Sequence, residues 1–265
     1  MAIAFRGETE IASGGATDPM SAPALPASTA NGDMVILGVI VKYGDVTTIA
    51  TNPPTGWTAV SNNENVNSGS DNAGNDDGNI RCALFFREKD ASWSTMPAVD
   101  LSGTPNCTMV GAISYSKGAG EVWDIACANA VDNSQSSTGV DPAASGTTLD
   151  FATGDLLYAF CGVNGDAGTP TVPMTVTVSG VTFGAATTRW DGATTSGTDL
   201  RGHSIESAYS SGTASAGPDG AFTLTTGAAT GMGVMIFARL RVTTVNSAAP
   251  PFDHPIRRSW HNLTR

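Results

Sequence analysis

Charged residues are scarce in this chain of 265 residues, and basic residues are the scarcest. Only 14% of the residues are charged, and 13 Lys and Arg stand against 24 Asp and Glu, for a formal net charge of −11. Nucleic-acid binding needs clustered Lys and Arg to neutralise phosphates, and docking on an anionic membrane surface needs basic segments too. The composition therefore argues against both kinds of partner.

Long hydrophobic runs and a secretory leader are also missing. The longest apolar run, residues 34–41, contains a glycine and ends at Lys42. This is far short of the roughly 18 apolar residues of a membrane span. The first residues, MAIAFRGE, have no basic segment followed by an apolar one. We therefore expect no signal peptide and synthesis in a cytoplasm.

Cysteines are few, and none has the spacing of a zinc or redox site. Cys82, Cys107, Cys127 and Cys161 include no C-x-x-C pair. Three of them lie inside strand-like runs, so buried free thiols are the favoured interpretation, with a disulfide as the alternative.

Catalytic motifs are absent as well. There is no G-x-S-x-G, and His203 lies in a strand-like run, whereas the other two histidines are near the C-terminus. The carboxylates that a hydrolase needs are scattered without a surrounding motif; they are Glu64, Glu88, Glu121 and Glu206. We therefore predict that the protein is not an enzyme and has no catalytic residues and no cofactor.

An acidic stretch is the one place where a metal ligand set is worth weighing. Residues 71–78, DNAGNDDG, offer hard oxygen ligands but lack the spacing of a calcium-binding EF-hand loop. A solvated turn is the favoured interpretation, so no metal site is predicted, and calcium binding by the polar loop 61–79 stays open.

Strand-and-turn patterns make up most of what is present. Short runs rich in Val, Ile, Thr and Phe end at Gly, Asn, Asp or Pro, which is typical of β-strands and turns. The runs are residues 34–42, 80–87, 107–115, 155–163, 174–183, 200–209, 221–225 and 232–242. Residues 121–130 have a weaker pattern that allows a helical turn. The pattern predicts an all-β protein of the sandwich or jelly-roll type.

An internal repeat divides the chain. Three strand-like runs recur in the same order at offsets of 120 to 124 positions, and Gly32-Asp33 recurs as Gly154-Asp155. We therefore predict two tandem β-sandwich units, at residues 1–118 and 141–243, joined by a linker at 119–140. The repeated aspartates are expected to bind turn amides rather than substrate.

The last segment, residues 244–265, differs from the acidic body and is predicted to be an extended docking arm. It is basic and contains prolines and a tryptophan. The residues expected to contact partners are Pro250, Pro251, Arg257, Arg258, Trp260 and Arg265. Four other tryptophans, Trp57, Trp93, Trp123 and Trp190, are expected to cover the core or the sandwich edges, with stacking on glycans as the alternative.

Several of these motifs together resemble the duplicated β-sandwich structural proteins of tailed-bacteriophage virions and prophage tails. The motifs are IAFRG at 3–7, GDMVI at 32–36, PPTGWT at 53–58, GDLL at 154–157 and the closing aliphatic strand at 232–242. The second unit lacks a clear counterpart of the Pro-x-Gly-Trp turn, and the arm lies outside the resemblance.

The resemblance implies a non-enzymatic virion part, in the tail or as a capsid decoration protein. Its partners would be other copies of the chain and other virion proteins, with a host-surface glycan as a further possibility. The alternative prediction is a carbohydrate-binding or host-adhesion module that uses loop 61–79 and exposed tryptophans.

Overall fold

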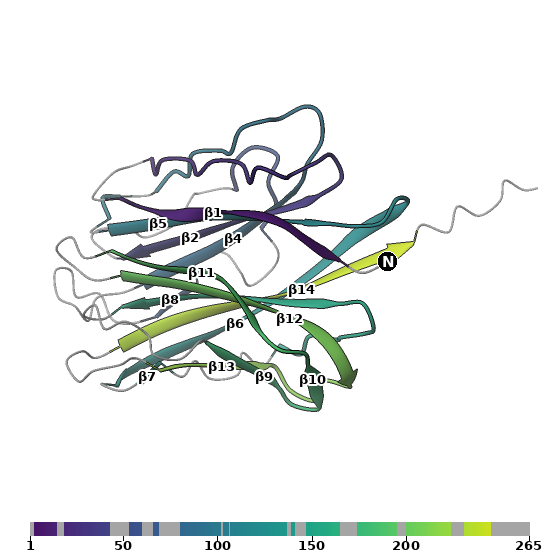
Figure 1. The fold of residues 1–265 in the computed structure, drawn as a ribbon. Coiled ribbons are helices and arrows are strands. Elements are labelled where there is room, and N and C mark those ends of the chain that lie inside the picture. Colours follow the sequence, from purple (N-terminus) through teal and green to yellow (C-terminus); the bar gives the residue numbers. More distant parts are fainter. Residues whose placement is uncertain are drawn as a thin grey trace, which may run out of the picture.

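The computed structural model describes residues 3–14, 19–42, 53–59, 66–68, 80–101, 103–105, 107–136, 139–140, 147–164, 174–194, 200–223 and 231–244. The regular structure in these ranges is all β (Figure 1). They contain no helix that is long and apolar enough to cross a membrane. The predicted all-β, sandwich-like fold class is confirmed.

The first sheet is antiparallel and has the strand order β1-β5-β2-β4-β3. Its strands are β1 (Ala4–Gly14), β2 (Met34–Lys42), β3 (Val66–Ser68), β4 (Ile80–Glu88) and β5 (Cys107–Ser116). The central strand β2 pairs over its whole length with β4 on one side and β5 on the other, so its polar backbone groups are satisfied within the sheet.

The second sheet has β8 at its centre, between β12 and β14, and β6 beyond β14. Its strands are β6 (Glu121–Ser136), β8 (Leu156–Asn164), β10 (Val181–Phe183), β11 (Thr187–Thr194), β12 (Leu200–Gly212) and β14 (Gly231–Thr244). Both β11 and β10 pair with β12, one after the other along its length. A small third sheet has the order β7-β13-β9, formed by β7 (Gly139–Val140), β13 (Pro218–Thr223) and β9 (Thr175–Val178).

The two large sheets have the same strand order. The order β1-β5-β2-β4-β3 in the first corresponds to β6-β14-β8-β12-β11 in the second. The sequence repeat aligns β2 with β8, β4 with β12 and β5 with β14, the same pairs that this order matches. The duplication itself stays a prediction, but the two sheets can be compared strand for strand.

The largest hydrophobic core lies between these two sheets (Figure 1). It contains buried side chains of both, among them Ile36, Leu84, Phe160 and Ile236. The two central strands, β2 and β8, contact each other across it. A sandwich is therefore formed between the predicted units, a packing that the sequence analysis did not foresee.

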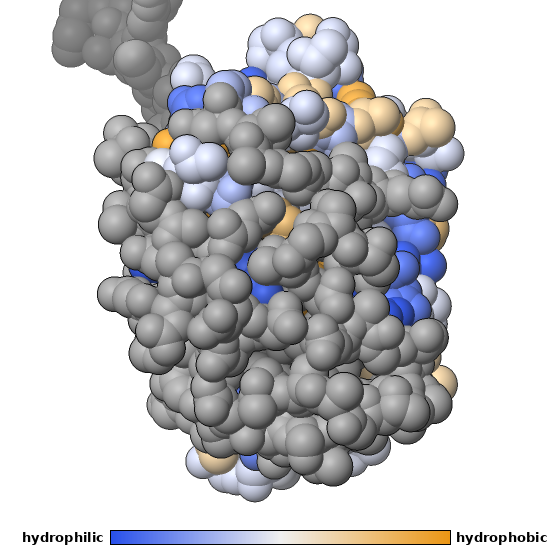
Figure 2. Space-filling view, turned by 90° about the vertical axis from the view of Figure 1, so that its left-hand side faces the viewer, coloured by the Kyte–Doolittle hydropathy of each residue, from blue (hydrophilic) through white to orange (hydrophobic). Residues whose placement is uncertain are grey.

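Each large sheet is also covered on its outer face. Met20, Trp57, Met96 and Val99, from irregular segments, cover the first sheet, and the third sheet together with residues 149–151 covers the second. Figure 2 shows the end at which β2 and β8 finish, with the more hydrophobic residues along the top and hydrophilic ones on one flank. The body is thus a four-layer stack, in which both faces of each large sheet are covered.

Residues 121–130 form part of strand β6, so the helical turn considered for them is wrong, and the expected linker contains this strand. Trp123, Ile125 and Cys127 face the core between the sheets, whereas Ala128 and Ala130 face the cover of the second sheet. Because both faces are covered, the strand lacks the polar alternation by which strands are recognised.

The two Gly-Asp turns have the structural role expected for them. The amide of Ala30 donates to Asp33 Oδ2 at 2.8 Å, and the amide of Ala152 donates to Asp155 Oδ2 at 2.7 Å. The glycines between them, Gly32 and Gly154, have φ of 92° and 96°. Only glycine adopts such a φ readily, so the motif encodes the turn that begins each central strand.

All four cysteines are buried and free, as the favoured interpretation predicted. Burial raises the pKa of the Cys82 and Cys161 thiols well above their ordinary value. Both groups are therefore neutral and behave as small core side chains.

Candidate functional site

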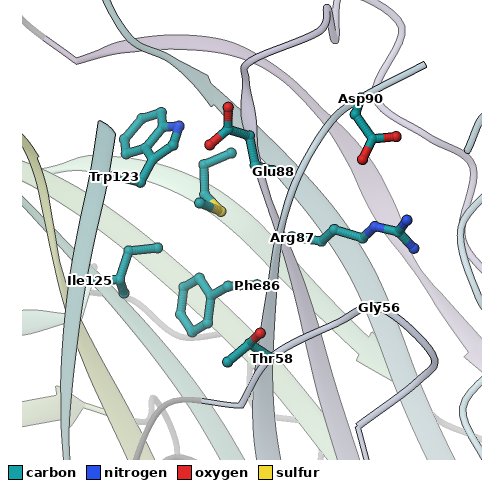
Figure 3. A pocket seen from close by; sticks show the side chains of 9 residues that line it. Gly56, Thr58, Phe86, Arg87, Glu88, Asp90, Trp123 and Ile125 are labelled. Carbon is teal, nitrogen blue, oxygen red and sulfur yellow. The ribbon is translucent and has the colours of Figure 1, made fainter. Parts of the chain in front are cut away.

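A pocket of about 400 Å³ opens between β4 and β6, at the end of the sandwich where the Gly-Asp turns lie. Figure 3 shows side chains of β6 and of β4 facing each other across it. The residues that line it are Met34, Gly56, Thr58, Phe86, Arg87, Glu88, Asp90, Trp123 and Ile125. They come from four segments that are far apart in the sequence.

The inner side of the pocket is apolar. Met34 and Phe86 belong to the central core, and Trp123 and Ile125 pack against that core while remaining partly exposed. The indole Nε1 of Trp123 donates to the carbonyl of Gly32 at 3.1 Å. This bond fixes the ring, so that Trp123 presents a flat, oriented surface beside the opening.

A carboxylate stands beside the tryptophan. Glu88 follows Phe86 on the same face of β4, and Figure 3 shows it near Trp123. Its Oε1 accepts a hydrogen bond from Lys117 Nζ at 2.8 Å, while the glutamate side chain stays 46% exposed. Glu88 is therefore held in place and still open to a ligand.

The pocket continues over the edge of β4 to Arg87 and Asp90. The Arg87 guanidinium lies 4.9 Å from the centre of the Trp93 ring, and its Nη1 donates to the carbonyl of Thr55 at 3.2 Å. The amide of Ser92 donates to Asp90 Oδ1 at 2.6 Å, and hydrogen bonds from Ser92 lower the pKa of this carboxyl. Both charged groups on this side are thus oriented by neighbours.

The Pro-Pro-Thr-Gly-Trp motif builds this rim. The amide of Trp57 donates to the carbonyl of Pro54 at 2.8 Å, and Gly56 has a φ of 80°, which a tight turn requires at this position. A Cβ on Gly56 would lie 2.6 Å from Arg87 Nη1. The glycine is therefore needed both for the turn and for the position of the arginine.

Glu206 belongs to a different cluster, which closes the opposite side of the sandwich. Tyr115 Oη donates to Glu206 Oε2 at 2.7 Å, and Arg189 forms an ion pair with the same carboxylate. The Arg189 guanidinium lies 3.6 Å from the centre of the Phe5 ring. Because these groups bind one another between β1, β5, β11 and β12, the cluster serves packing.

A second charged cluster lies on β14. Arg239 bonds Asp124 at 2.7 Å and Asp150 at 2.5 Å, and Arg241 bonds Asp155 at 2.7 Å and Asp150 at 2.9 Å. The hydrogen bond with Asp155 is the main reason why the pKa of Arg241 is raised. The two arginines therefore tie β6, β14 and the second Gly-Asp turn together.

His203 is buried in β12, as expected for a packed strand residue. Its Nδ1 lies 3.6 Å from Asp191 Oδ1, and its side chain is 4% exposed. Burial lowers its pKa, and Asp191 only partly opposes this shift. Within the described residues, no three His, Cys, Asp or Glu side chains come together as a metal site would require.

The structure divides the other candidate residues into two groups. Trp57 and Trp190 are buried in the cores, at 6% and 3% exposure, whereas Trp93 and Trp123 remain partly exposed. The expected partner-binding residues of the arm, Pro250 to Arg265, lie outside the described residues. So does most of loop 61–79, of which only β3 is described.

The pocket itself was missed by the sequence analysis. Glu88 and Trp123 were each weighed, but separately and for different chemistries. Met34 and Phe86 lie in predicted strands and Ile125 in the expected linker, so none of the three was a site candidate. One signal in the sequence could have indicated it: Trp123 lies in the expected linker, and a large aromatic side chain needs packing partners.

Comparison with known proteins adds no assignment. None of the protein-family models, curated proteins or solved structures compared with this chain matches it.

Proposed function

We propose that this chain is a non-enzymatic structural protein of a bacteriophage virion, which acts by assembling with other copies of itself and with other virion proteins. The virion class rests on the strand and turn motifs of the sequence. The observation that carries assembly is the strand β6, a long edge strand that carries no basic residue or proline and pairs regularly with β14 over its first twelve residues.

Edge strands present unpaired N–H and C=O groups, and proteins normally guard them with charges, prolines or bulges. Strand β1 is guarded in this way. It carries Arg6, Glu8 and Glu10, and its pairing with β5 has two register shifts. Strand β11 carries Arg189 and Asp191 and has a register shift of its own.

Strand β6 has fewer of these guards. Its charged residues are the acids Glu121, Asp124 and Asp132. It has 16 residues and contains no Lys, Arg or Pro. Its register with β14 is regular from Glu121 to Asp132, and within the described part of the chain it pairs with no other strand. All three acids are engaged within the chain: Glu121 accepts from the amide of Gly118 at 2.6 Å, Asp124 is bound by Arg239, and Asp132 is buried.

The first half of β6 is the segment best suited to contact a partner. Val122, 42% exposed, is the one large hydrophobic side chain among the described residues that is largely exposed. If β6 of a second copy pairs with it antiparallel about a two-fold axis, the second sheet continues across the interface. Such a contact needs no second kind of protein.

The molar mass in solution tests this proposal. By size exclusion with light scattering, the protein is expected to have at least twice the single-chain mass of 26.9 kDa. Val122→Lys introduces an edge charge and is expected to shift the protein toward the single-chain mass. Ala4→Lys, at an exposed site on the guarded strand β1, is the matched control and is expected to leave the mass unchanged.

Either of two results would contradict assembly through β6. One is a single-chain mass for the unmodified protein at high concentration. The other is an oligomer whose mass is the same in the Val122→Lys and Ala4→Lys variants.

Carbohydrate binding, the second candidate function, is favoured by the pocket that Trp123 and Glu88 border. In a virion protein it would serve adhesion to a host surface.

A further inference from the structure

We infer that the pocket between β4 and β6 is a binding site for a neutral pyranose sugar, with Trp123 as its stacking surface. The site deepens the second candidate function and does not depend on assembly through β6. It differs from the site expected from the sequence, because it uses neither loop 61–79 nor the arm.

The first argument is the combination of surfaces. A pyranose ring has faces of C–H groups and an edge of hydroxyls, so its site needs a flat apolar surface beside hydrogen-bonding groups. Trp123, with Ile125 and Phe86, supplies the apolar surface, and Glu88 stands next to it (Figure 3). The carboxylate of Glu88 can accept hydrogen bonds from sugar hydroxyls, including a pair of hydroxyls on neighbouring ring carbons.

The second argument is that these side chains are already held in place. The Trp123 indole N–H is bound to the Gly32 carbonyl at 3.1 Å, and Glu88 is bound to Lys117 at 2.8 Å. Arg87 is fixed by Trp93 and by the Thr55 carbonyl. Because these groups do not have to be ordered on binding, the entropy cost of binding is reduced.

The third argument concerns size and charge. A pocket of about 400 Å³ is at the lower end of the range for small-molecule sites and fits one or two sugar rings. Glu88 is balanced by Lys117. The pKa of Asp90, at the outer rim, is lowered first by hydrogen bonds from Ser92 and then by the positive charges of Arg87 and Lys89. The balance of charges favours an uncharged ligand over an anionic one.

The test is a set of separate titrations of the full-length protein, in which binding is measured by calorimetry and by tryptophan fluorescence. The ligands are methyl α-glucoside, methyl α-mannoside, methyl β-galactoside and N-acetylglucosamine. We expect at least one of them to bind with a dissociation constant of about 1 mM, as its size implies. Trp123→Ala is expected to weaken binding about tenfold, and Glu88→Gln severalfold.

The controls keep folding and binding apart. Trp123→Phe keeps a flat ring but loses the bond to Gly32, so an intermediate affinity is expected. Asp219→Asn changes an exposed carboxylate on β13, away from the pocket, and is expected to leave affinity unchanged. If Trp123→Ala does not fold, the affinities of Trp123→Phe and Glu88→Gln test the site.

Two outcomes would overturn the inference: no binding of any of the four sugars at concentrations far above a millimolar, or equal binding by the unmodified protein and the pocket variants. Binding by a chain of single-chain mass would support the sugar site while contradicting assembly through β6. Oligomers that bind none of the sugars would contradict the sugar site while leaving assembly through β6 supported.

Discussion

Strands β1 and β6 occupy the same place in their sheets, next to β5 and β14, yet their edges are built in opposite ways. Strand β1 carries charges of both signs and has two register shifts, whereas the first twelve residues of β6 pair regularly with β14 and carry acids but no basic residue. The fold requires neither design, because both strands complete equivalent sheets. In the proposed assembly this difference makes β6 the contact strand, and the candidate pocket borders β6 rather than β1.

The centre of the molecule shows how similar sheets fit face to face. Gly38 of β2 lies against Phe160 of β8, and Gly162 of β8 lies against Ile40 of β2. At an offset of 122 positions, Gly38 aligns with Phe160 and Ile40 with Gly162. Each large side chain thus packs on a glycine in the aligned position of the other strand. Two large residues would clash there, and two glycines would leave a cavity.

Removing this complementarity is expected to have the largest effect on stability. In Gly38→Ala, the new Cβ would lie 2.5 Å from Trp190 and 3.0 Å from Phe160, two buried rings that have little room to shift. We expect the free energy of unfolding to fall by about 1–3 kcal/mol in chemical denaturation. Gly184→Ala, whose Cβ would have its nearest neighbour at 3.7 Å, is the control and should change stability by less than about 0.5 kcal/mol. Equal effects of the two substitutions would contradict the packing described.

Substitutions in the two Gly-Asp turns are expected to have intermediate effects on the free energy of unfolding. Asp33→Ala removes the turn bond to the Ala30 amide and a long ion pair with the exposed Arg6 at 3.5 Å, at an expected cost of about 1 kcal/mol. Asp155→Ala removes the same bond and also the contacts with Arg241 at 2.7 and 2.9 Å, so we expect about 2–3 kcal/mol. Urea unfolding of both variants measures the difference. If Asp33→Ala costs as much as Asp155→Ala, the Arg241 network stabilises the second turn no more than the single Arg6 ion pair stabilises the first.

A pH effect confined to the second sheet is expected to be the smallest. His203 aligns with Ala83 of the first sheet, and both are buried. Because burial lowers the pKa of His203, the unfolded chain takes up a proton first as the pH falls below about 6.5. The stability contributed by the neutral histidine is therefore present above that pH and is lost below it.

Unfolding midpoints at about pH 7.5 and about pH 5.5 measure this loss. We expect the midpoint of the unmodified protein to fall more over this interval than that of His203→Gln. A larger fall in the variant would show that the sign is wrong.

Much of the sheet architecture was predictable from single segments. The runs at 34–42, 80–87 and 107–115 became β2, β4 and β5 because predominantly apolar runs suit strands buried on both faces. The run at 174–183 proved to be two strands, β9 and β10, joined by a turn at Gly180 with a φ of 83°. These features are local, so a local pattern is enough to find them.

The remaining features depend on contacts between distant segments. Strand β11, with the sequence TTRWDGAT, has too little apolar alternation to be recognised, and it is fixed by pairing with β12 and by Trp190 in the core. The pocket depends on β4 and β6 lying on the same side of the sandwich. The spacing of residues in the sequence does not predict which edge of one sheet lies over which edge of the other.

Amide hydrogen exchange as a function of protein concentration tests assembly through β6 most directly. The account predicts that amides in Val122–Ala126 exchange more slowly as concentration rises, because they become paired with another chain, while those in Ala4–Thr9 of β1 do not change. Exchange in both segments that is independent of concentration, in a protein shown to be oligomeric, would place the interface elsewhere and contradict the account.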